Sequence, residues 1–207
     1  MRTGKIVIMP TRARHPAEVA RRSGFRVYLR APRSVDAAAF LAAARASRTL
    51  HDGWVYPPRT AVLFATYVRR YGRFRNAEPE GATHAGLLVC RCEDDALVGV
   101  FNLSEIVRGA FQSAYLGYYA FVPHAGGGYM SEGLELALGV AFRKLRLHRV
   151  EVNVQPTNHR SLALVRRAGF DREGYSRRYV RIGGRWCDHV RFALLVEDWR
   201  ARASAQR

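Results

Sequence analysis

The stretch Ser113–Ser131, read S-A-Y-L-G-Y-Y-A-F-V-P-H-A-G-G-G-Y-M-S, decides the fold of this chain. Its first half is rich in aromatic and small apolar residues, and it predicts a strand that ends at Pro123. Three consecutive glycines, Gly126–Gly128, follow, and an amphipathic helical pattern begins at Tyr129. The stretch therefore predicts a strand, a flexible loop and a helix in direct succession.

The glycine run is suited to binding an anion such as a phosphate. Backbone N–H groups can converge on the anion when no side chains intervene, and the positive end of the following helix adds to the attraction. An ordinary glycine-rich loop is an equal alternative, because short glycine motifs are common. The rest of the sequence has to decide between the two.

Length and composition indicate one globular domain. The 207 residues can bury one sizeable core, and 48% hydrophobic with 25% charged residues argues against disorder. No apolar run approaches the ~18 residues that cross a bilayer, so we expect a cytoplasmic protein with no membrane partner. We assign residues 25–199 to the domain, 1–24 to an N-terminal extension and 200–207 to a tail. The extension is expected to be loosely ordered, with an edge strand or a basic arm as alternatives.

The chain is strongly basic, with 34 lysines and arginines against 17 acidic residues and a net charge of +17. Such a surface could contact RNA, cofactor phosphates or an acidic protein, and a compositional bias of the source genome explains it equally well. The three cysteines make no disulfide framework, and Cys90 and Cys92 lack the further ligands of a zinc site. We expect these cysteines to be packing residues and expect no bound metal.

Hydrophobic patterning predicts further elements on both sides of the opening stretch. Before it, we expect a strand at 25–31, helices at 34–47 and 60–71, and strands at 83–92 and 97–107. After it, we expect a helix at 129–145, a strand at 149–154, a short helix at 158–169, and strands at 175–182 and 185–196 joined at Gly183-Gly184. The strand at 149–154 should return parallel to the one before the glycines, in a right-handed crossover.

This order of elements resembles the GNAT acyl-CoA N-acyltransferases, with V-N-V-Q-P-T-N-H-R-S-L at 152–162 and A-G-F-x-x-E-G-Y at 168–175. Within that superfamily, I-V-R-G-A-F (106–111), Y-L-G-Y (115–118), N-x-x-S (158–161), R-A-G-F-D-R-E-G-Y (167–175) and G-R-W-C-D-H-V (184–190) look like the bacterial ribosomal-protein-alanine N-acetyltransferases. The resemblance implies an α/β (α+β) GNAT fold, with a mixed V-shaped sheet of about seven strands and about four helices. The strands at 114–122 and 149–154 would splay apart to admit acetyl-CoA.

The same resemblance implies which residues hold the pyrophosphate of acetyl-CoA. The family pattern Q/R-x-x-G-x-G/A falls on Ala125 to Met130, and this chain departs from it at Ala125 and at Met130. Because backbone N–H groups do the binding, we expect the site to survive these departures. The expected phosphate-binding residues are Gly126, Gly127, Gly128, Tyr129, Met130 and Ser131.

Acetyl transfer requires a neutral amine, a polarised thioester carbonyl and a proton for the leaving thiolate. The resemblance implies that backbone N–H groups near Phe121 and Val122 polarise the carbonyl. It also implies that Asn158 and Ser161 contact the cofactor, and Ser161 is the candidate that protonates the thiolate. Helix capping is a second role for Asn158, compatible with the first.

The general base is harder to identify. Some related N-terminal acetyltransferases carry a glutamate at the position that aligns with Asn153, whose amide cannot accept a proton but could hold a water. Glu105 and Glu151 are the nearby carboxylates that could end a water-relayed path, with a solvated surface charge as the alternative for each. We expect Asp188 and His189 to make structural hydrogen bonds.

The leading functional hypothesis is an acetyl-CoA-dependent enzyme that acetylates the N-terminal amine, on alanine, of a ribosomal or similar protein by direct transfer in a ternary complex. One alternative acceptor is a small amine such as an aminoglycoside, because acceptor loops are poorly read from sequence. Another alternative is a weakly catalytic ribosome-assembly or RNA-binding protein on the same scaffold, which the net charge of +17 would suit.

Overall fold

One mixed sheet organises the chain in the computed structural model, which describes residues 18–72, 74 and 81–205. The described part holds eight strands in the order β1-β2-β3-β4-β5-β6-β8-β7, and β5–β6 is the parallel pair among them. The parallel return of β6 confirms the predicted connection, and β3, β4 and β5 form an antiparallel meander. The strands are β1 (Glu18–Arg21), β2 (Val27–Arg30), β3 (Ala85–Arg91), β4 (Leu97–Val107), β5 (Ser113–Ala120), β6 (Arg149–Val154), β7 (Asp171–Ile182) and β8 (Arg185–Leu195).

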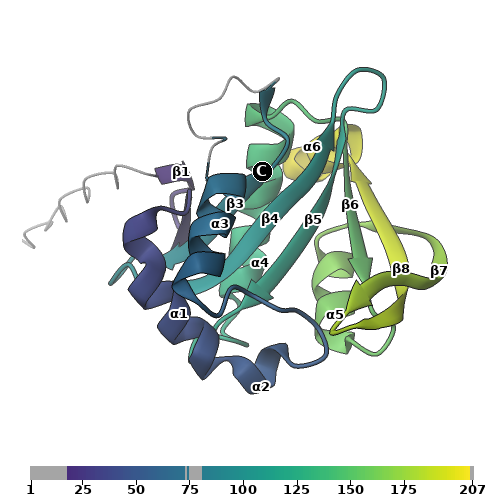
Figure 1. Cartoon of the computed structure of the whole chain (residues 1–207). Helices are drawn as coiled ribbons and strands as arrows, with labels where there is room; N and C mark the ends of the chain where they lie inside the picture. Colours follow the sequence, from purple (N-terminus) through teal and green to yellow (C-terminus); the bar gives the residue numbers. More distant parts are fainter. Residues whose placement is uncertain (1–17, 73, 75–80, 206–207) are drawn as a thin grey trace, which may run out of the picture.

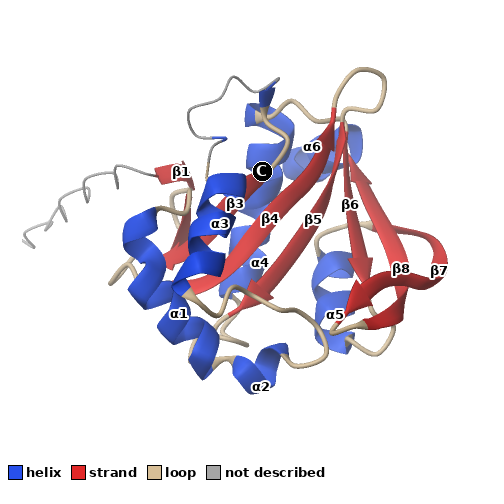
Figure 2. Cartoon of the chain, in the orientation of Figure 1, coloured by secondary structure: helices blue, strands red, loops and turns tan. Residues whose placement is uncertain are grey.

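Helices cover both faces of this sheet, as Figures 1 and 2 show. One apolar cluster joins α1 and α3 to β2–β5 around Phe40, Phe64 and Phe121. The other joins the last three helices to the opposite face around Leu134, Leu138 and Val165. The helices are α1 (Ala37–Ala46), α2 (Arg48–His51), α3 (Ala61–Tyr71), α4 (Tyr129–Gly139), α5 (His159–Arg167) and α6 (Val196–Ala205).

Helix α4 packs closely on the sheet because Gly133 lacks a side chain. A Cβ at Gly133 would lie 3.0 Å from the Phe101 ring and 3.2 Å from Val89. A π-helical turn, Val140–Lys144, continues α4, where the sequence predicted one helix to residue 145. The strand-loop-helix unit predicted from Ser113–Ser131 is confirmed as β5, a loop and α4.

Three elements differ from expectation. β1 lies inside residues 1–24 and pairs with β2, so the edge-strand alternative holds for Glu18–Arg21, while residues 1–17 lie outside the described part. Helix α2 lies between the helices expected at 34–47 and 60–71, where no element was predicted. Helix α6 crosses the expected boundary between domain and tail, because Trp199 packs on Phe142 with ring centroids 5.4 Å apart.

Candidate active site

A gap opens in the sheet between β5 and β6. The two strands pair over three residues, Ser113–Tyr115 with Arg149–Glu151, and beyond that point they no longer pair with each other, although each stays paired with its other neighbour. Figure 1 shows them diverging toward the lower edge of the sheet. This is the splayed arrangement that the sequence led us to expect.

The glycine loop and the start of α4 lie beyond the end of β5. Gly126 and Gly128 adopt left-handed backbone angles, with φ of +87° and +80°, and a Cβ at Gly126 would meet open space. The first turn of α4 has no side-chain cap. Two N–H groups of the expected phosphate-binding set already have backbone acceptors: that of Ser131 donates to Gly128 O at 3.0 Å and that of Gly127 to His124 O at 3.3 Å. A helix N-terminus of this kind, preceded by an open loop, attracts phosphate.

Arg26, which the sequence did not single out, braces this loop. Its Nη2 donates to Gly127 O at 3.1 Å, and its guanidinium lies 4.4 Å from the centre of the Tyr129 ring. Its Nε and backbone N–H each donate to Glu132 at 2.6 Å. The side chain of Met130 packs on the core, so a cofactor contact at this position would involve the backbone.

Helices α1 and α2 hold the end of β5. The Val122 N–H donates to Ser47 Oγ at 3.0 Å, and His51 Nε2 lies 2.7 Å from Ala120 O. Burial lowers the pKa of His51, so the ring is neutral and Nε2 carries the proton that this carbonyl accepts. Ser47 and His51 therefore fix the strand from which the loop departs.

Hydrogen bonds at the end of β5 contradict the expectation that the N–H groups near Phe121 and Val122 polarise the carbonyl. The Phe121 N–H donates to Val98 O of β4 at 2.7 Å, and the Val122 N–H is bound to Ser47. Neither N–H is left to face a thioester. Because backbone groups alternate sides along a strand, the N–H groups of Tyr118 and Ala120 point away from β4 and toward the gap.

Helix α5 borders the other side of the gap. Asn158 caps it by accepting the Ser161 N–H at 3.1 Å, which confirms its capping role and leaves its amide NH₂ for a second partner. The Ser161 hydroxyl makes no hydrogen bond to another described residue, whereas Ser161 O accepts from the Tyr118 hydroxyl at 3.3 Å. Burial raises the pKa of Tyr118 to about 12, so that phenol stays protonated. Tyr118 thus ties β5 to α5 across the gap.

The face of the sheet beside α3 presents polar side chains above the gap. Asn153 Oδ1 is buried and has no hydrogen-bond partner among the described residues. A Cβ at Gly117 would meet open space, although β5 is a central strand, and the Tyr115 and Tyr179 hydroxyls lie 3.4 Å apart. An orphaned buried acceptor beside an open glycine provides room and a partner for an incoming amine or water.

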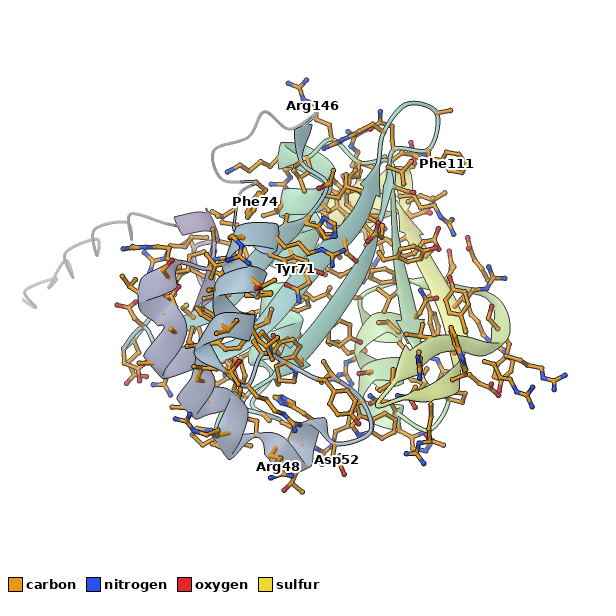
Figure 3. The ribbon with its side chains drawn as sticks, in the orientation of Figure 1. Arg48, Asp52, Tyr71, Phe74, Phe111 and Arg146 are labelled. Carbon is orange, nitrogen blue, oxygen red and sulfur yellow. The ribbon has the colours of Figure 1, made fainter. Side chains whose placement is uncertain are left out.

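Glu105 and Glu151 lie at the paired end of β5 and β6 and line a shallow hollow of about 220 Å³ with Phe111, which projects from the β4–β5 loop in Figure 3. Glu105 is exposed and pairs with Arg70 at 3.2 Å. Glu151 is partly buried and pairs with Arg149 at 2.9 Å. Both ion pairs favour a solvated surface charge over a role in proton transfer, and they do so more strongly for Glu105 than for Glu151.

The remaining sequence candidates have structural partners. Asp188 accepts hydrogen bonds from the Tyr175 hydroxyl at 2.5 Å and the Arg178 N–H at 2.7 Å, and His189 Nδ1 lies 3.0 Å from Cys187 O, which confirms both structural roles. Cys90 is buried in the apolar cluster beside α1. Across residues 18–72, 74 and 81–205, no group of three or more His, Cys, Asp or Glu side chains could hold a metal ion. In the same residues, no helix combines the length and apolar character that a membrane crossing needs.

Comparison with known proteins agrees with this geometry. Residues 26–171 match a family model described as an acetyltransferase (GNAT) domain. The chain is 40% identical over 121 residues to "Probable N-acetyltransferase YjcK" of Bacillus subtilis, covering 58% of this chain and 66% of that protein. It is 41% identical over 107 residues to the ribosomal protein uS5-alanine N-acetyltransferase of Escherichia coli, covering 52% and 55%. The chain thus spans between half and two thirds of the length of these relatives.

Solved structures give the same result over a longer span. The structure of Mycobacterium smegmatis RimJ in complex with CoA-disulfide superposes with a TM-score of 0.74 at 26% identity. The match covers 87% of this chain and 90% of that one.

Proposed function

Since this chain belongs to the GNAT acetyltransferase family, we propose that it transfers the acetyl group of acetyl-CoA to the N-terminal amine of a ribosomal protein, with alanine as the first residue. The observation that carries the proposal is the unpaired stretch of β5 and β6 next to the uncapped N-terminus of α4. A thioester in that gap would place its pantetheine arm along β5 and its pyrophosphate on the loop Gly126–Ser131.

The residues around the gap divide the chemistry between them. Acetyl-CoA supplies the acetyl group as a thioester. The N–H groups of Tyr118 and Ala120 polarise its carbonyl, and the Ser161 hydroxyl gives a proton to the departing thiolate as the C–S bond breaks. Asn153 Oδ1 holds the amine, or a water that takes the amine's proton to solvent, as the C–N bond forms.

An N-terminal amine suits a site without a buried carboxylate base. Its unperturbed pKa of about 8 leaves a useful neutral fraction at pH 7, whereas a lysine amine near 10.4 would need a stronger base. The name of the Escherichia coli relative supports alanine at the N-terminus of a ribosomal protein as the acceptor. The basic surface would also repel a polycationic small amine such as an aminoglycoside.

Mass spectrometry of proteins incubated with the enzyme and acetyl-CoA tests the proposal. Unacetylated ribosomal proteins should gain one acetyl group at an N-terminal alanine, and a Gly128→Asp variant should leave them unmodified. Acetylation of an aminoglycoside or polyamine in preference to every protein N-terminus would overturn the acceptor assignment. Binding of acetyl-CoA with no acetyl transfer to any amine would instead favour a non-catalytic role.

A further inference from the structure

A second concave site lies away from the gap, on the face of the sheet that α4 and α6 cover. This groove, of about 350 Å³, lies between β1, the C-terminal half of α4, its π-helical turn and α6. In Figure 1, α4 and α6 lie behind the sheet, on the side away from α1 and α3. Its charged lining residues are Arg21, Arg22, Arg143, Lys144, Arg202 and Glu135, which are five cations and one carboxylate.

The groove is separate from the acetyl-transfer site. Gly139, in its wall, lies eleven positions after Gly128 of the phosphate loop, which is roughly 16 Å along α4 at 1.5 Å per residue. None of the lining residues belongs to β5, β6, α5 or the glycine loop. A ligand here would leave the gap between β5 and β6 open.

Two of its cations, Arg143 and Arg22, lie against aromatic rings. The Arg143 guanidinium lies 4.7 Å from the Trp199 ring centre, and that of Arg22 lies 5.0 Å from Phe25. Among the residues that the structure describes, Arg22, Arg143 and Lys144 form no ion pair. A guanidinium held on a ring face keeps its charge and its edge N–H donors for another anion.

Gly139 adds an opening in the wall. Gly139 lies within a helical segment, where glycine destabilises the helix by about 1 kcal/mol relative to alanine. Gly133 has a packing reason, but a Cβ at Gly139 would meet nothing within 4 Å. The π-helical turn that begins at the next residue is a rare feature, often found at functional sites. Gly139 shapes the groove without contributing to the core, whereas the π-helical turn also packs on the core through Val140, Ala141 and Phe142.

From this groove we infer a binding site for the phosphodiester backbone of single-stranded RNA. A planar guanidinium group can donate two parallel hydrogen bonds to two phosphate oxygens, and the bases of single-stranded RNA can stack on the face of an arginine guanidinium group. Glu135 can accept a hydrogen bond from a ribose 2′-hydroxyl or a base amino group, which an acidic peptide would not offer in the same place. The inference does not depend on acetyl transfer.

Gly139 allows a sharp test, because a side chain can be added there without displacing a neighbour. We would measure fluorescence anisotropy of a labelled single-stranded RNA with the full chain, in saturating CoA so that RNA phosphates cannot occupy the loop. Gly139→Glu should weaken binding about tenfold, and the neutral, isosteric Gly139→Gln should stay within about twofold of wild type. Both variants should melt at or above the wild-type temperature, since each replaces a helical glycine.

Charge removal gives a second, independent measurement. Arg143→Gln should weaken RNA binding and reduce the slope of log K against log salt by about 0.7, as one lost phosphate contact predicts. Arg177→Gln, which removes the same charge from exposed β7, is the matched control and should leave affinity nearly unchanged. Acetylation of a free peptide should be unaffected by Gly139→Glu.

Four results would overturn the inference. The first is that the chain binds no RNA, and the second is that the Gly139→Glu and Gly139→Gln variants bind RNA equally well. The third is that Arg177→Gln and Arg143→Gln weaken binding equally. The fourth is that polyglutamate displaces RNA at a concentration of negative charges lower than that of the RNA. The last would assign the groove to an acidic peptide, and the third would make the binding a diffuse effect of net charge. Failure of acetyl transfer with intact, groove-dependent RNA binding would contradict the proposed function alone.

Discussion

The two sides of the β5–β6 gap differ in whether backbone groups or side chains line them. On the side that we propose for the cofactor, the groups that would face a ligand are backbone N–H groups of β5, the glycine loop and the first turn of α4. On the side that we propose for the acceptor, they would be side chains from three strands, among them Tyr115, Asn153 and Tyr179. The first side is continuous in sequence, whereas the second is assembled across the sheet.

This difference sets how each side should respond to substitution. A backbone site is damaged by a change in local conformation or charge and should tolerate most side-chain changes nearby, such as the departures at Ala125 and Met130. A side-chain site depends on single atoms, such as Asn153 Oδ1 or the Ser161 hydroxyl. Five predictions test the distinction.

The largest effect is expected from Gly128→Asp. Gly128 has φ of +80°, where an L-residue is strained by about 1–2 kcal/mol, and the carboxylate would repel a phosphate at the helix N-terminus. Calorimetry should show acetyl-CoA binding more than about 100-fold weaker. Gly184→Asp, at φ of +83° in the open β7–β8 turn, carries the same strain and charge and should bind normally. Equal affinities for the two variants would place the cofactor elsewhere.

Ser161→Ala should lower turnover by about 10- to 100-fold, because an acid acts mainly at the thiolate-forming transition state. Cofactor affinity should stay within about twofold, since the capping bond to Asn158 comes from the Ser161 backbone. Steady-state kinetics with binding measured separately distinguish the two effects, and Ser161→Thr should restore part of the activity. A raised Michaelis constant for acetyl-CoA at unchanged turnover would make Ser161 a binding contact.

Asn153→Leu should reduce turnover per Michaelis constant for a peptide about tenfold without changing acetyl-CoA affinity. The variant keeps the volume but removes the unpartnered acceptor from the acceptor face. Asn153→Gln is the matched control that retains an amide. If the leucine variant instead weakens acetyl-CoA binding, Asn153 belongs to the cofactor side and the comparison fails.

His51→Gln should change stability against pH and leave the pH profile of catalysis alone. Burial lowers the folded-state pKa of His51 below 6.5, so the unfolded chain takes up a proton first as pH falls, and stability is lost below about 6.5. Glutamine can still donate to Ala120 O but does not titrate. Denaturant melts between pH 7 and 5 should therefore show a slope reduced by up to about 1.4 kcal/mol per pH unit. A shifted profile of turnover would give His51 a catalytic role.

The smallest effects are expected from the two carboxylates. Glu105→Gln should change turnover less than about twofold, since this exposed group already pairs with Arg70. Glu151→Gln, nearer the gap on the strand of Asn153, should cost no more than about threefold. The pH dependence of turnover per Michaelis constant provides the measurement. A loss of about 100-fold in either variant would identify the general base and end the water-path proposal.

Much of the cofactor side was predictable because its cause is local. The apolar run, the three glycines and the amphipathic helix of Ser113–Ser131 each act through neighbouring residues, and the parallel return of β6 follows from the helix that connects it to β5. The cap at Asn158 and the Gly183-Gly184 hairpin are local for the same reason. The error on this side, at Phe121 and Val122, concerned which way N–H groups point, and that depends on the register with β4.

The sequence by itself determined the order of the elements, the glycine loop between β5 and α4, and the resemblance to the family. Only the tertiary structure decided which atoms meet across long separations: Ser47 with Val122, Arg26 with the loop, and Tyr118 with α5. It also decided that Asn153 Oδ1 is orphaned and that the wall at Gly139 is open. The physical reason is that local pattern fixes backbone conformation, whereas burial, orientation and unsatisfied hydrogen bonds arise from packing between segments far apart in the chain.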